Sequence, residues 1–86
     1  MSNEDKHDQH IKIVVNGREK IVTQRQLTYT EVIHLAFDAP PFGENIVYTV
    51  TYKRGDDHRP EGTMVEGDSV KVKAGMIFNV TRTDKS

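Results

Sequence analysis

One helical segment, residues 27–37, constrains the fold of this chain more than any other stretch. Its apolar residues recur at i, i+3, i+4, i+7 and i+8, which is the spacing of one helix face. They are Tyr29, Val32, Ile33, Ala36 and Phe37. A helix of about ten residues is marginal in water by itself, so another element must cover this face. The rest of the chain reads as strands and turns, so the simplest architecture is one helix laid across one sheet.

Both ends of the helix are marked in the sequence. Thr28 stands where an N-cap belongs and Glu31 follows three residues later, which predicts a capping box. Leu27 and Val32 occupy the two positions of a hydrophobic staple. The helix must end before the prolines at 40 and 41, because a proline disfavours helical geometry at the preceding residue.

Length and composition exclude several functions. The chain has 86 residues and a formal net charge of −1. A domain of this size buries roughly 60–65% of its unfolded surface, which leaves no room for a deep catalytic cleft. A net charge this close to zero argues against a nucleic-acid binder. The chain has no cysteine, membrane span or signal-peptide core, which predicts a soluble cytoplasmic protein without disulfides.

The first half of the chain contains a predicted hairpin. Residues 1–9 are polar and predict a disordered lead-in. Residues 10–15 alternate as a half-buried strand, and 18–23 return as a second strand. Between them Asn16-Gly17 is the strongest short hairpin signal, because both residues tolerate the positive φ of a type I′ turn. Residues 24–26 then link the second strand to the helix cap.

The second half predicts three more strands. After a turn-rich connection at 38–45, in which Phe42 is expected to tuck under the helix end, the best strand runs from 46 to 53. Residues 54–68 read as a loop with at most a short strand around 63–65. Residues 69–73 and 76–81 alternate again, and a polar tail follows. The expected inward residues are Ile11, Ile13, Val15, Ile46, Tyr48, Val50, Tyr52, Val70, Val72, Met76, Phe78 and Val80.

The predicted element order is strand, strand, helix, strand, strand, strand. A hairpin, a helix crossing the sheet and then further strands form the β-grasp arrangement, in which the last strand runs parallel beside the first. The two central strands should then be the most apolar, and residues 11–15 and 76–80 fit that requirement. The predicted fold class is α+β, a mixed sheet of four to five strands with one helix packed across it.

No residue group in the sequence predicts an enzyme. Residues 55–61 gather carboxylates and a histidine, but they are nearly consecutive, which fits a solvated turn better than metal ligands. His34 is expected on the polar side of the helix, and no histidine belongs to a recognisable nucleophile motif. We therefore predict no catalytic residue, no metal site and no cofactor.

Two surface features remain open. A basic face is one interpretation of Lys12, Lys20, Lys53, Arg54, Lys71 and Lys73, but surface lysines that deter strand aggregation are favoured, because the net charge is near zero. Alternation also places Val14, Val47 and Ile77 on the sheet face away from the helix. These three form either a partner-docking patch or a coincidence of exposed aliphatic residues.

Several segments together resemble a known family. They are residues 11–17 (IKIVVNG), the helix, residues 50–55 (VTYKRG), residues 60–63 (PEGT) and residues 70–80 (VKVKAGMIFNV). The chain is similar to bacterial ubiquitin-like β-grasp modifiers, in particular to single-domain relatives of the multi-ubiquitin-domain proteins encoded beside activating-enzyme, conjugating-enzyme and peptidase genes. The resemblance spans about residues 10–86, and it implies a β-grasp domain at 10–82 with a C-terminal tail at 83–86.

The resemblance implies a protein modifier whose C-terminal carboxylate is adenylated, passed to a conjugating enzyme and joined to a target. The tail would be Thr83, Asp84, Lys85 and Ser86. Ubiquitin-type modifiers end in Gly-Gly, so three alternatives stay open: Ser86 reacts, a processing peptidase trims the tail, or no conjugation occurs. The expected partners are activating-like and conjugating-like enzymes, the peptidase and target proteins, without nucleic acid or membrane. The rival hypothesis is a non-covalent β-grasp interaction module.

Overall fold

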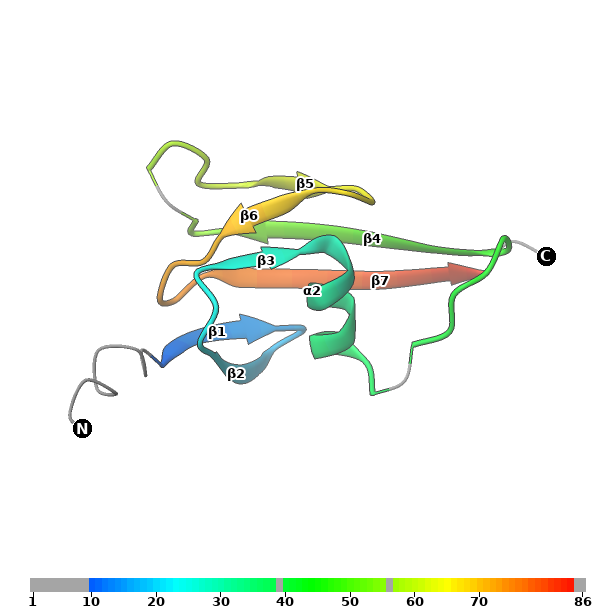
Figure 1. Cartoon of the computed structure of the whole chain (residues 1–86), viewed down its shortest axis with the longest axis horizontal. Coiled ribbons are helices and arrows are strands. Elements are labelled where there is room, and N and C mark those ends of the chain that lie inside the picture. The colour runs from blue at the N-terminus through cyan, green and yellow to red at the C-terminus, as the bar shows by residue number, and fades with distance from the viewer. Residues whose placement is uncertain (1–9, 39, 56, 85–86) are drawn as a thin grey trace.

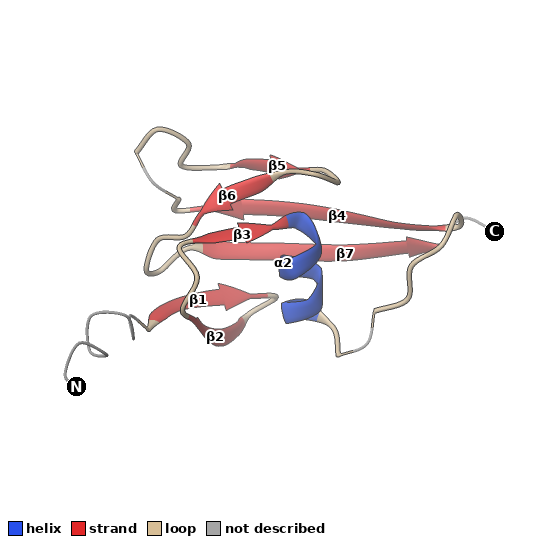
Figure 2. Cartoon of the chain, viewed as in Figure 1, coloured by secondary structure: helices blue, strands red, loops and turns tan. Residues whose placement is uncertain are grey.

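A computed structural model describes residues 10–38, 40–55 and 57–84. In chain order its elements are β1 (Ile11–Val15), β2 (Arg18–Val22), β3 (Gln26–Thr28), α2 (Tyr29–Ala36), β4 (Ile46–Lys53), β5 (Gly62–Met64), β6 (Ser69–Lys71) and β7 (Ile77–Asp84). Five strands form one sheet in the order β2-β1-β7-β4-β5, and β3 pairs with β6 in a separate two-stranded sheet. Helix α2 lies across the larger sheet (Figures 1 and 2). The lead-in predicted at 1–9 lies outside the described residues.

The larger sheet has the predicted β-grasp topology. β1 and β2 form an antiparallel hairpin, and β7 runs parallel beside β1 at the centre of the sheet. Asn16 and Gly17 have φ values of 53° and 81° at the hairpin turn. Because an Asn-Gly pair adopts positive φ at little cost, the sequence can turn here within two residues. The fold class is therefore α+β, with a mixed five-stranded sheet and one helix.

The predicted capping box is present at the start of α2. The Glu31 backbone N–H donates to Thr28 Oγ1 at 3.1 Å, and the Thr28 N–H donates to Glu31 Oε1 at 2.9 Å. These two bonds satisfy polar groups that the first helical turn leaves without partners. The helix ends at Ala36, and Phe37 forms its C-cap. The end therefore falls before the two prolines, as predicted.

Two tyrosine hydroxyls attach the helix and the connection that follows it to β4. The Tyr29 hydroxyl donates to the Tyr48 carbonyl at 2.8 Å, and the Tyr48 hydroxyl donates to the Pro41 carbonyl at 2.7 Å. Burial raises the pKa of the Tyr29 hydroxyl above its ordinary value of 10.0. The phenol therefore stays protonated, and remains a donor, throughout the physiological pH range.

The core lies between α2, the small sheet and the inner face of the large sheet. No polar or charged residue is buried in the part of the chain that the structure describes. The inner faces predicted for the strands at 10–15, 46–53 and 76–81 are confirmed, since their side chains are buried or half-buried. The buried core residues are Ile13, Val15, Val22, Leu27, Val32, Ile33, Tyr48, Val50, Tyr52, Met64, Val70, Met76, Phe78 and Val80.

The small sheet is the main departure from the prediction. Residues 24–26 were expected to be a link, but β3 begins at Gln26 and pairs with β6 through Leu27 and Val70. The Val72 N–H also donates to the Arg25 carbonyl at 2.9 Å, which continues the pairing beyond β3. These partners are about forty residues apart in sequence, so local alternation carries no signal of their pairing.

Phe42 does not tuck under the helix. Its side chain is 54% exposed, although its ring lies 5.8 Å from the His34 ring and 5.5 Å from the Tyr48 ring. Pro40 is the buried residue of this connection instead. The hydrogen bond from Tyr48 to the Pro41 carbonyl holds the chain there, so Phe42 is left at the surface.

The loop after β4 is held more tightly than its composition indicates. The Gly55 N–H donates to the Pro60 carbonyl at 2.8 Å, and Gly55 itself is buried. A Cβ added at Gly55 would lie 2.7 Å from the Arg59 carbonyl oxygen. The backbone therefore closes on itself at a point where no side chain fits.

We predict that Ile13→Asp or Phe78→Asp unfolds the domain, because both side chains are 0% exposed. A buried unpaired carboxylate costs several kcal/mol, which is comparable to the whole stability of about 5–10 kcal/mol expected for a small domain. Ile21→Asp is the matched control, since Ile21 is 60% exposed. Circular dichroism melting curves that leave all three variants like the parent would show that the inward faces are assigned wrongly.

Gly55→Ala should lower the free energy of unfolding by about 1–3 kcal/mol, because its Cβ has to displace backbone. Gly43→Ala is the control, since nothing lies within 4 Å of the Cβ it would add. Urea denaturation midpoints measure both variants. Equal midpoints for the two would mean that the 55–60 loop opens at little cost.

Candidate functional site: the C-terminal strand and its surroundings

β7 carries the chain toward its predicted functional end. It pairs with β4 along its whole length, from Ile77 opposite Lys53 to Asp84 opposite Ile46. The strand is therefore longer than the predicted 76–81, and Thr83 and Asp84 of the predicted tail are paired residues. Beyond Val80 the strand has no apolar residue to bury, so alternation could not reveal it; β4 supplies the backbone partners. Lys85 and Ser86 lie outside the described residues.

Asn16 clamps β7 from the hairpin turn. The Val80 N–H donates to Asn16 Oδ1 at 2.8 Å, and Asn16 Nδ2 donates to the Val80 carbonyl at 3.1 Å. The side-chain amide therefore imitates a strand partner at the point where β1 has ended. The same asparagine makes the turn and extends the ladder by one position. The sequence signal for the turn was clear, but the clamp joins residues 64 positions apart and has none.

Past the clamp, one edge of β7 is open. The carbonyls of Met76 and Phe78 accept bonds from the β1 side, and Val80 bonds Asn16 on that side. By alternation the backbone groups of Arg82 and Asp84 face the same way. Within the described residues no strand pairs with that edge at these two positions. β4 and β7 thus project past the hairpin and the helix as a two-stranded ribbon (Figure 1).

The exposed end of the ribbon carries one ion pair. Arg82 Nε donates to Asp84 Oδ1 at 3.2 Å, and Arg82 Nη2 donates to Asp84 Oδ2 at 3.3 Å. Both side chains are about half exposed, at 44% and 57%, so this pair stabilises the fold little. It places opposite charges side by side on an unpaired strand edge, which deters unspecific strand addition.

The predicted apolar patch does not hold together. Val14 and Ile77 are register partners on β1 and β7 and lie side by side, and both are half-buried. Val47 pairs with Thr83, six residues along β7 from Ile77, a separation of about 20 Å. The three residues share a face but not a patch. The exposed Ile21, opposite Lys12 in the hairpin, lies nearer to Val14 than Val47 does.

The predicted metal-like and basic groups can also be placed. Among the described residues no three His, Cys, Asp or Glu side chains gather as a metal site requires. Asp56 of the 55–61 loop lies outside those residues. The lysines at 12 and 53 are on the open face of the large sheet, whereas Lys71 is on the small sheet. The six basic residues considered in the sequence therefore do not make one face.

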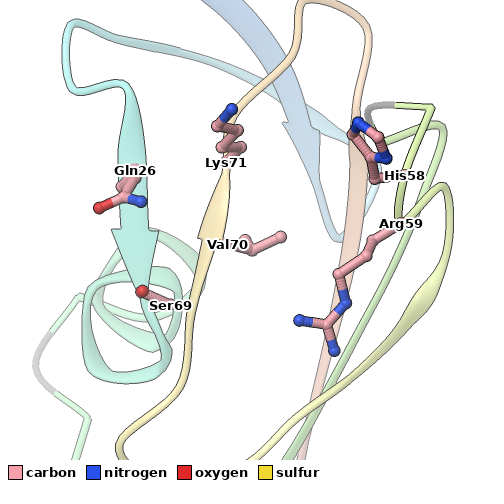
Figure 3. A pocket seen from close by; sticks show the side chains of 6 residues that line it. All are labelled: Gln26, His58, Arg59, Ser69, Val70 and Lys71. Atoms are coloured by element: carbon pink, nitrogen blue, oxygen red, sulfur yellow. The ribbon is translucent and has the colours of Figure 1, made fainter.

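A hollow of about 270 Å³ lies beside the small sheet (Figure 3). It is lined by Gln26, His58, Arg59, Ser69, Val70 and Lys71. Sequence reasoning missed this hollow, because its cations come from two segments that only the β3–β6 pairing and the closed 55–60 loop bring together. Within the described part of the chain, no helix has the length and apolar character needed to span a membrane.

The fold and the C-terminal strand define a ubiquitin-like β-grasp protein. The family model described as Multiubiquitin matches residues 11–84, from the first residue of β1 to the last of β7. The chain belongs to the Multiubiquitin family. Comparisons with curated proteins and with solved structures found no match.

We predict that Asn16→Gly lowers the free energy of unfolding by about 1–2 kcal/mol, because two hydrogen bonds to Val80 are lost while glycine keeps the turn. Amide hydrogen exchange at Val80 should accelerate more than exchange at Ile13. Asn45→Gly, at an exposed loop asparagine, is the control. Unchanged Val80 exchange in Asn16→Gly would show that β1 and β7 hold this position without the clamp.

Proposed function

We propose that this protein is a bacterial ubiquitin-like modifier, activated at its C-terminus and joined to target proteins by partner activating and conjugating enzymes. One observation supports the proposal most: in a chain of the Multiubiquitin family, the strand that leads to the C-terminus projects together with β4 past the hairpin and the helix. A modifier needs its terminal carboxylate to enter an enzyme active site while its own core stays folded.

The physical properties of the ribbon suit that requirement. The last four residues of β7 are all exposed, so detaching them from β4 breaks backbone hydrogen bonds but removes no β7 side chain from the core. Thr83 and Asp84 belong both to the predicted tail and to β7, so an enzyme would engage the end of the strand itself. The clamp at Val80 then sets how far the strand can open, because opening beyond it exposes the core.

The proposal assigns this chain the role of substrate. Thr83, Asp84, Lys85 and Ser86 are the segment offered to the enzymes, with Ser86 or a trimmed end as the reacting carboxylate. ATP would be used by the activating enzyme, so no cofactor is assigned to this domain. The proposed setting is the cytoplasm, with protein partners and without nucleic acid or membrane.

A non-covalent β-grasp interaction module is the second candidate. The pairing of Thr83 and Asp84 with Val47 and Ile46 favours it, because a held strand end is less available to an active site than an unpaired tail. The two candidates differ in whether a covalent bond forms through the C-terminus, and that bond can be measured.

The first test expresses an N-terminally tagged chain in its native host, with Ser86 left at the C-terminus. Tagged species are purified under denaturing conditions and analysed by intact and peptide mass spectrometry. The modifier proposal expects heavier species joined through the C-terminus, and the junction peptide identifies the reacting residue. Recovery of the unmodified mass alone, while the partner enzymes are expressed, would favour the interaction module.

Deleting residues 83–86 should abolish those conjugates and leave the domain folded, because only two β4–β7 pairs are lost and neither involves a core side chain of β7. The melting temperature should fall by no more than about 8 °C, the change expected for about 1 kcal/mol in a domain of this size. Thr63→Ala, at an exposed position on β5, should conjugate normally. A truncated chain that keeps full partner binding and function would contradict the modifier proposal.

A further inference from the structure

A groove runs along the small sheet. The 270 Å³ hollow beside β6 adjoins a second, more open depression of about 720 Å³, and the two share Gln26 and Lys71. Ile11, Arg25 and Val72 line the second depression as well. We call this continuous depression the β3–β6 groove. Both depressions are open to solvent and meet at the paired residues Gln26 and Lys71, so the groove suits an extended chain better than a compact small molecule.

The β3–β6 groove concentrates positive charge. Arg25, Arg59 and Lys71 line it, His58 stands at one wall, and none of the described lining residues is acidic. The whole chain carries a net charge of −1, so this accumulation departs from the average surface. In Figure 3, His58 and Arg59 come from the loop on one side and Gln26, Ser69 and Lys71 from the small sheet on the other, with Val70 between them.

Backbone hydrogen bonds hold these cations in place. Lys71 is the register partner of Gln26, and the Val72 N–H donates to the carbonyl of Arg25 at 2.9 Å. The loop that carries Arg59 is closed by the bond from Gly55 to Pro60. The positive charges therefore project from backbone that is already ordered, which lowers the entropy lost when an anionic chain binds.

We propose that the β3–β6 groove binds an extended acidic peptide segment of a partner protein. Carboxylates of the segment would lie against the exposed Arg25 and Lys71, and the half-buried Val72 would contact its backbone or aliphatic groups. Nucleic acid fits less well, because the described lining has no Phe, Tyr or Trp ring for bases to stack on.

The position of the groove suits a modifier. The loop with His58 and Arg59 lies at the opposite end of the molecule from the end of β7 (Figure 1). A peptide bound there leaves Asp84 and the segment after it open to an active site. The inference rests on the proposed function in one respect, which is the kind of protein that supplies the acidic segment. The binding of that segment needs no conjugation.

Fluorescence anisotropy of a labelled peptide tests the proposal with the full chain. The probe is a peptide of about ten residues that alternates Glu and Ser, and the matched peptide has Gln in place of every Glu. The acidic peptide should bind at least about tenfold more tightly than the Gln peptide at about 50 mM NaCl, and the difference should shrink at about 300 mM NaCl. Equal binding of the two peptides would overturn the proposal.

Charge reversal locates the site. Lys71→Glu and Arg25→Glu should each weaken binding of the acidic peptide by at least about fivefold. Lys53→Glu makes the same charge change on the open face of the large sheet. It should weaken peptide binding by less than about half the fold-change of the other two variants. All three side chains are exposed, so the melting temperatures should stay within a few degrees of the parent's.

Two outcomes contradict the inference. If Lys53→Glu weakens binding as much as Lys71→Glu, the peptide responds to overall charge and not to the groove. If a single-stranded oligonucleotide of equal charge binds more tightly than the peptide, the ligand is a nucleic acid. Neither outcome changes the result expected in the conjugation experiment. The groove proposal and the modifier proposal can therefore fail independently of each other.

Discussion

Burial of the helix against the central strand pair is the contact on which the rest of the structure depends. A helix of eight residues does not persist by itself, and the parallel pair β1–β7 offers the apolar surface that stabilises it. Ile13, Phe78 and Ile33 are all completely buried at this contact. The capping box fixes where the helix begins, and the Tyr29 hydroxyl attaches the helix to β4. The Tyr48 hydroxyl attaches the connection after the helix to the same strand.

The two halves of β7 differ in burial and in pairing. Its first half belongs to the core, with Phe78 and Val80 buried, and its second half is exposed backbone paired only with β4. Asn16 marks the boundary between them, because its side chain completes the ladder where β1 ends. This division supports the proposed modifier role, because the terminal segment can detach without removing a β7 side chain from the core.

The small sheet adds a second kind of surface to the β-grasp frame. By pairing β3 with β6 it buries Leu27 and Val70 and arranges Arg25 and Lys71 beside one another on the outside. A molecule with almost balanced charge thereby gains a local basic groove, at the end opposite the C-terminal strand. The lining of this groove and the end of β7 have no residue in common.

The sequence by itself determined the elements whose signals are local. The capping box at Thr28, the Asn16-Gly17 turn and the alternation of residues 46–53 each act over a few neighbouring residues, so the helix, the hairpin and β4 were predicted correctly. Only the tertiary structure decided the β3–β6 pairing, the Asn16–Val80 clamp, the extension of β7 to Asp84 and the separation of Val47 from Val14. Each of these depends on which distant backbone groups face one another, and pairing between exposed or short strands leaves no periodic trace in the chain.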